Sequence, residues 1–160
     1  MHNELPGAPI SGPVAVFVTF LLALIGYAGL TTMMVTVARG WWPVLVARAT
    51  VAIIVAHVLL VWHVRYEWQF SEATRNGYVG FAIFHAALAA VVASLAVDFS
   101  VARRLVTGAF AAVTVGAVAA TFRYEVVESF RIPVLIITTT GIAGLAHARL
   151  VASRSRRSTR

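Results

Sequence analysis

The stretch VARATVAIIVAHVLLVWHVRYEWQFSEATRNGYVGFAIFH, Val46–His85, decides the fold of this chain. Two apolar segments flank the polar loop RYEWQFSEATRNG, and each segment carries one histidine, His57 or His85. Long apolar runs separated by a short charged loop are typical of helical hairpins that cross a membrane. We therefore expect a membrane protein whose other helices pack around this hairpin.

The composition supports the same class. Of 160 residues, 60% are hydrophobic and only 12% are charged, and the mean hydropathy is +0.86. The chain contains neither lysine nor cysteine. This excludes a lysine Schiff base, a thiolate nucleophile, an iron–sulfur cluster and a covalently attached c-type haem. A bound cofactor must use histidine, carboxylate, hydroxyl or backbone groups.

The apolar runs predict an all-α five-helix transmembrane bundle within residues 14–149. The first run, Val14 to Val37, has 24 uncharged residues, enough to span about 30 Å of hydrocarbon at about 1.5 Å per residue. A cleaved signal peptide is the rival interpretation, but no basic segment precedes this run. The helices are expected at about 14–37, 43–64, 78–97, 105–122 and 132–148, between an irregular extracytoplasmic lead-in at 1–13 and a basic cytoplasmic tail at 150–160.

The arginines predict the orientation of the bundle. Nine of them fall after the first and third helices or in the tail, and four fall in the opposite connections. Because arginine is enriched on the cytoplasmic side, this places the N-terminus outside and the C-terminus in the cytoplasm of a prokaryotic cell. The same distribution favours a topology signal over a nucleic-acid site, although the sequence pI is near 11.3.

A weak internal repeat relates helices 2–3 to helices 4–5. An Arg-Tyr-Glu triplet ends the second helix at residues 65–67 and the fourth at residues 123–125. Each triplet is followed by a further glutamate and arginine, Glu72 and Arg75 or Glu128 and Arg131. This pattern suggests a tandem repeat of a two-helix unit. Short matches are common in such a chain, so an unduplicated chain remains the alternative.

The two histidines are the candidate cofactor and metal ligands. His57 and His85 each lie seven residues from the outer loop, so both are expected about 10 Å below the outer surface. Two imidazoles at one depth on antiparallel helices are the arrangement that ligates a b-type haem. At the same level, Gly116 would leave room for the macrocycle, and Thr138 or Thr139 could donate a hydrogen bond.

The alternative is a structural role. Histidines in membrane helices commonly bond to a hydroxyl, a backbone carbonyl or one another, or contact a lipid or quinone. The other histidines have plainer interpretations: His63 as an interfacial anchor, His147 as a cation at a helix C-terminus, and His2 as a lone candidate copper ligand. In the loops, the arginines and glutamates are expected to pair with one another.

Two functions follow from these patterns. The first is an accessory or structural subunit of a larger membrane complex, such as a respiratory or other redox assembly, that contacts lipid and other membrane subunits or further copies of itself; no catalytic motif indicates an enzyme. The second is an electron-transfer or quinone-reactive protein with one haem between His57 and His85. A transporter is less favoured, because the middle of the predicted spans holds no acidic or basic side chain.

Overall fold

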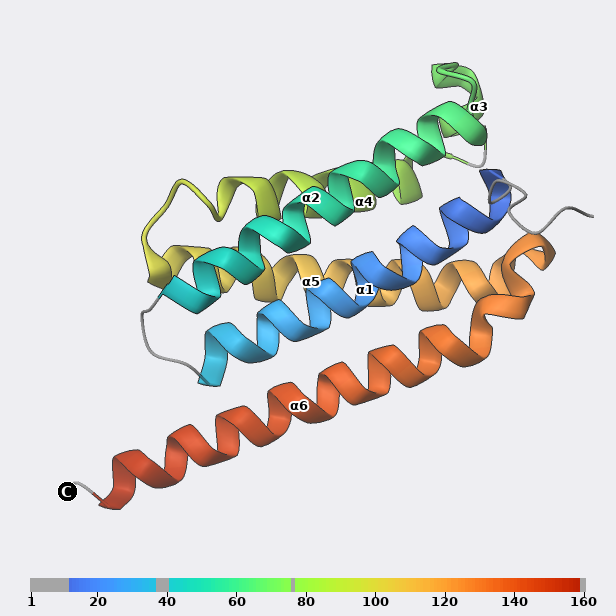
Figure 1. Cartoon of the computed structure of the whole chain (residues 1–160). Coiled ribbons are helices and arrows are strands. Elements are labelled where there is room, and N and C mark those ends of the chain that lie inside the picture. Colours follow the sequence, from blue (N-terminus) through green and yellow to red (C-terminus); the bar gives the residue numbers. More distant parts are fainter. Residues whose placement is uncertain (1–11, 37–40, 76, 159–160) are drawn as a thin grey trace, which may run out of the picture.

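The computed structural model describes residues 12–36, 41–75 and 77–158, and throughout them the chain is helical or in short connections, without a strand. Five long helices alternate in direction along the chain (Figure 1). They are α1 (Gly12–Thr36), α2 (Trp41–Val64), α4 (Tyr78–Ala93), α5 (Phe99–Arg123) and α6 (Arg131–Ser158). Two short elements occupy the loops at one end of the molecule, α3 (Phe70–Thr74) and the 3-10 helix η1 (Glu125–Phe130).

Four of these helices are long and apolar enough to cross a membrane. The spans are Gly12–Thr36, Val44–Val64, Phe99–Arg123 and Val127–Val151. Helix α4 is also apolar, but it has only 16 residues and is shorter than a usual span. The all-helical, membrane-compatible character predicted from the apolar runs is therefore confirmed.

Helix α1 lies at the centre of the arrangement and packs against α2, α5 and α6, whereas α4 packs mainly on α5. The main core joins one face of each long helix. Leu24 and Val134 are almost completely buried there, beside Phe110 of α5. A smaller core at the other end joins α1, α2 and α5 through Leu30, Met34, Ala47, Ala102 and Val106.

Glycine allows the closest helix contact. A Cβ atom at Gly141 of α6 would lie 2.7 Å from Cζ of Phe110 and 2.9 Å from Cβ of Ala28. Since real Cβ atoms do not approach other atoms so closely, only glycine permits α6 to sit this near to α1 and α5.

Several helix ends differ from the predicted ones. Helix α4 ends at Ala93 rather than near 97, α5 begins at Phe99 rather than near 105, and α6 continues to Ser158. The predicted start of α5 and end of α6 differ because the prediction placed arginines in loops. Arg103 and Arg104 lie within α5 with exposed side chains, because a long basic side chain can reach the interface from a continuing helix. These arginines therefore do not mark the end of a helix.

Candidate functional site

His57 faces α1. Its Nδ1 atom lies 3.0 Å from Oγ1 of Thr19, and the Thr19 hydroxyl donates to the Ala15 carbonyl at 2.8 Å. Because the Thr19 hydroxyl already donates its proton to a backbone carbonyl, its oxygen accepts a hydrogen bond from the Nδ1–H group of His57. The Phe20 ring lies beside the imidazole, with 5.7 Å between ring centroids. His57 thus makes a hydrogen bond between two helices.

His85 is bonded within its own helix. Its Nδ1 atom lies 2.8 Å from the Phe81 carbonyl oxygen, and because a carbonyl only accepts, Nδ1 carries the proton. The Phe81 ring stacks on the imidazole at a centroid distance of 3.9 Å, and the Trp62 ring lies edge-on at 6.3 Å. The Nε2 atom is buried and has no hydrogen-bond partner. It presents an unused lone pair.

The two imidazoles have different neighbours. His57 meets α1, whereas His85 meets Trp62, which follows His57 by five residues on α2 and so lies about 7.5 Å further along that helix. No ring contact joins the two histidines in the part of the chain that the structure describes. Both rings do share one property: a fixed Nδ1–H leaves Nε2 as the atom available to a ligand.

The other residues predicted at this level have separate surroundings. A Cβ atom at Gly116 would lie 3.0 Å from Cζ of Phe84, so the Phe84 ring occupies the space beside this glycine. Thr139 is exposed and donates to the Leu135 carbonyl at 2.7 Å. Thr138 is buried, and its hydroxyl has no partner. Among the described residues, no group of three or more His, Cys, Asp or Glu side chains is arranged to hold a metal ion.

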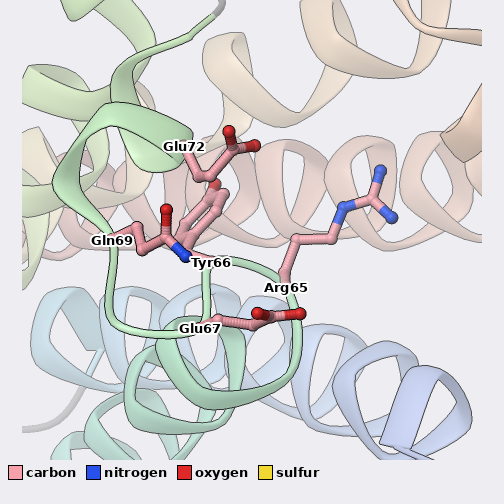
Figure 2. A pocket seen from close by; sticks show the side chains of 5 residues that line it. All are labelled: Arg65, Tyr66, Glu67, Gln69 and Glu72. Carbon is pink, nitrogen blue, oxygen red and sulfur yellow. The ribbon is translucent and has the colours of Figure 1, made fainter.

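The loop after α2 forms a polar hollow of about 170 Å³. It is lined by the side chains shown in Figure 2: Arg65, Tyr66, Glu67, Gln69 and Glu72. Glu72 also forms an ion pair with Arg75 at 3.1 Å. The backbone is unusual here, since Glu67 and Trp68 both have positive φ angles, 48° and 61°. Non-glycine residues rarely adopt this conformation, and it is energetically costly.

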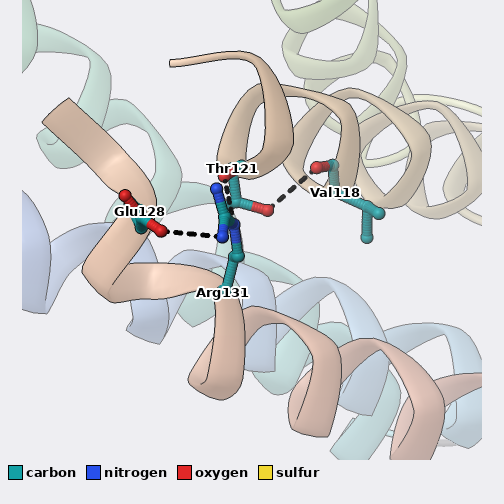
Figure 3. A network of polar contacts seen from close by, with 4 residues as sticks. All are labelled: Val118, Thr121, Glu128 and Arg131. Carbon is teal, nitrogen blue, oxygen red and sulfur yellow. Dashed lines mark hydrogen bonds and ion pairs between the residues drawn. The ribbon is translucent and has the colours of Figure 1, made fainter. Parts of the chain in front are cut away.

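The loop after α5 is more tightly tied to the bundle. Arg131 pairs with Glu128 at 2.8 Å, and its Nε–H group donates to the Thr121 carbonyl at 2.9 Å (Figure 3). The guanidinium also lies over the Phe122 ring, 5.0 Å from its centroid. The predicted pairing of loop arginines with glutamates is therefore present in both loops, between the same residue types at the same three-residue spacing.

Tyr66 of the first Arg-Tyr-Glu triplet is half-buried. Burial raises the pKa of the Tyr66 phenol above its ordinary value; Arg65 opposes this rise and Tyr124 adds to it.

The remaining candidates lie apart from these contacts. His63 and His147 are exposed, and Tyr27 is buried with a relative exposure of 3%. His2 lies outside the described residues.

Sequence reasoning missed Thr19 as the partner of His57, since nothing in the sequence fixes which face of α1 meets α2. It also missed Phe81, although its spacing of four residues before His85 signals contact on one helix face.

No known protein family, curated protein sequence or solved structure matches this chain. The functional argument therefore depends on the geometry of its own residues.

Proposed function

We propose that this protein is a small accessory or structural subunit of a larger membrane complex, such as a respiratory or redox assembly, in the cytoplasmic membrane of a prokaryote. The observation that carries the proposal is the exposure of its helices: only 17% of the apolar window of α2 and 22% of that of α6 is buried inside the chain. The remaining apolar surface requires lipid or the helices of other subunits around it.

The same proposal includes five membrane-spanning helices, with the N-terminus outside and the C-terminus in the cytoplasm. The alternating directions of α1, α2, α4, α5 and α6 support it. The matched ion pairs Glu72–Arg75 and Glu128–Arg131 support a tandem repeat of the α2–α4 and α5–α6 units.

Electrophoresis of native membranes under non-denaturing conditions tests the subunit role. We expect the chain to migrate in an assembly much larger than its own 17.2 kDa, and we expect deletion of its gene to reduce the amount of that assembly. A chain that migrates as a monomer in several mild detergents, and whose deletion leaves other membrane complexes unchanged, would contradict the proposal.

The second candidate is an electron-transfer or quinone-reactive protein. The buried Nε2 atom of His85 favours it, because an unpartnered nitrogen with a lone pair is costly unless a metal or donor group occupies it. A b-type haem would be held by His57 and His85 together and would supply one-electron transfer, whereas a quinol hydroxyl would need only one of the two nitrogens.

An absorption spectrum of the purified protein separates these ligands. A reduced-minus-oxidised b-type spectrum that disappears in both His57→Ala and His85→Ala supports haem. A colourless preparation from cells supplied with haem contradicts it. His63→Ala, at an exposed histidine, serves as the control that leaves the spectrum unchanged.

A further inference from the structure

The hollow beside α2 contains two charges that do not neutralise one another. Arg65 and Glu67 both line it, yet neither forms an ion pair within the described residues. The third charged group of the lining, Glu72, is already paired with Arg75. Figure 2 shows the Arg65 guanidinium extended away from the other side chains, with the Glu67 carboxylate below its stem. The hollow therefore offers one unpaired positive and one unpaired negative group.

The backbone holds Glu67 in this place. Its positive φ angle of 48°, followed by 61° at Trp68, reverses the chain directly after α2. The turn is closed by a hydrogen bond from the Trp68 N–H to the Trp62 carbonyl at 3.0 Å. A costly conformation is kept only when its surroundings enforce it, and such positions concentrate at binding sites.

The aromatic residues place the hollow at the depth of lipid headgroups. The Trp68 ring, 60% exposed, stacks on Trp62 with 6.3 Å between centroids, and Tyr66 lies edge-on to Trp62 at 5.8 Å. Tryptophan and tyrosine gather at the boundary between hydrocarbon and water, because their rings are apolar at one end and polar at the other. Tyr66 belongs both to this aromatic group and to the lining of the hollow.

We propose that this hollow binds the headgroup of a zwitterionic phospholipid with a primary ammonium. The phosphate pairs with Arg65, and the ammonium donates hydrogen bonds to the Glu67 carboxylate, within reach of the Tyr66 hydroxyl and the Gln69 amide. An anionic or a cationic ligand would neutralise only one of the two free charges. A trimethylated ammonium has no N–H to donate, so phosphatidylethanolamine is favoured over phosphatidylcholine. This inference does not depend on the subunit role.

Native mass spectrometry of the full chain, released from vesicles with equal amounts of phosphatidylethanolamine and phosphatidylcholine, tests the assignment. We expect preferential retention of phosphatidylethanolamine. Glu67→Gln reduces this preference by up to about fivefold, the upper end of what an exposed ion pair supplies. Arg65→Gln lowers the retention of both lipids to a similar degree, because both carry the phosphate that Arg65 would bind. The matched controls are Glu125→Gln and Arg123→Gln in the second triplet, which keep the preference. Both Glu67 and Arg65 are exposed, so these variants retain the fold, as a melting curve verifies.

Two results would overturn the assignment. One is equal retention of the two lipids by the unchanged chain, or equal losses in the first-triplet and control variants. The other comes from soluble phosphoethanolamine as a probe. If it raises the melting temperature of the delipidated protein through Glu67 at concentrations below those at which the lipid acts, the hollow belongs to a soluble zwitterion.

Discussion

The two hairpins, α2–α4 and α5–α6, share the Arg-Tyr-Glu ending and the following glutamate–arginine pair, but they use these residues differently. In the second hairpin, Arg131 reaches back to the Thr121 carbonyl and so fastens the loop to α5. In the first, Arg75 has only Glu72 as an ion-pair partner, and its side chain is 67% exposed. Similar loops thus serve as a structural clamp in one hairpin and as an open polar surface in the other.

The hairpins also differ inside the bilayer region. Helix α6 of the second hairpin is held to α1 and α5 through Gly141, whereas α2 and α4 carry the two imidazoles, and Nε2 of His85 has no hydrogen-bond partner. Among the described glycines, Gly141 in the second hairpin has the tightest contact, although a Cβ atom at Gly26 of α1 would also lie only 3.0 Å from Thr50 of α2. The first hairpin differs in carrying the two imidazoles suited to ligands.

The largest effect is expected at the glycine contact. Gly141→Ala places a methyl group against Phe110 and Ala28 and forces α6 outward, so we expect a loss of about 1–3 kcal/mol in the free energy of unfolding. Gly80→Ala in α4 has no atom within 4 Å, so it should be neutral or stabilise by up to about 0.5–1 kcal/mol. Chemical unfolding in detergent, followed by circular dichroism, compares them. Equal unfolding midpoints would remove the distinction between the hairpins.

A smaller effect is expected at the loop arginines. Arg131→Gln loses the hydrogen bond to the Thr121 carbonyl along with a partly exposed ion pair, at a cost of about 1–2 kcal/mol. Arg75→Gln loses an exposed pair and should cost at most about 0.5 kcal/mol. The same unfolding measurement applies, and the salt dependence of each variant separates the ionic part. A cost for Arg75→Gln that equals or exceeds that for Arg131→Gln contradicts the clamp.

At the strained turn after α2, a substitution is expected to raise the stability of the fold rather than lower it. Glu67→Gly should raise stability by up to about 1 kcal/mol, because glycine adopts a positive φ angle without the steric cost of a side chain. Glu125→Gly in η1, at the matching place in the second triplet, should lower stability by about 1 kcal/mol, since glycine disfavours helical backbone. Thermal melting of both variants measures the difference. Two losses of similar size would show that the turn carries no strain.

The smallest effect concerns alkaline pH. Because the pKa of Tyr66 is raised in the folded chain, the unfolded chain releases this proton first, from about pH 10. Folding stability that is complete below this pH is therefore lost as pH rises further. Tyr66→Phe should flatten the decline in melting temperature above about pH 10, while Tyr78→Phe, at an exposed ring, should leave it unchanged. An identical decline in all three proteins contradicts burial of the Tyr66 phenol.

The positions of the helices could be predicted because long apolar runs between charged clusters leave few alternatives in a bilayer. Each of the five expected segments overlaps one helix, although the segment expected at 78–97 extends beyond the end of α4 at Ala93. Their ends were less predictable, since arginines such as Arg103 continue a helix at the interface. The loop ion pairs were predictable because opposite charges three residues apart in a short segment meet locally.

The surroundings of the histidines could not be predicted in the same way. Depth along a helix follows from counting residues, but the direction of a side chain depends on how helices rotate against their neighbours. The sequences of α1, α2 and α4 are apolar around the whole circumference of each helix. No polar face therefore indicates how each helix is rotated about its own axis. Thr19 therefore emerged as the partner of His57, and Trp62 as the neighbour of His85, only from the packed helices.

The shortness of α4 has a consequence for the surrounding lipid. Sixteen residues rise about 24 Å, against about 30 Å of hydrocarbon in a typical bilayer. If α4 spans the membrane, the lipid on its side must thin by several ångströms, at a cost of fractions of a kcal/mol per ångström. Such hydrophobic mismatch would draw the protein toward thinner membranes and would be relieved when a partner helix replaces the thinned lipid along α4.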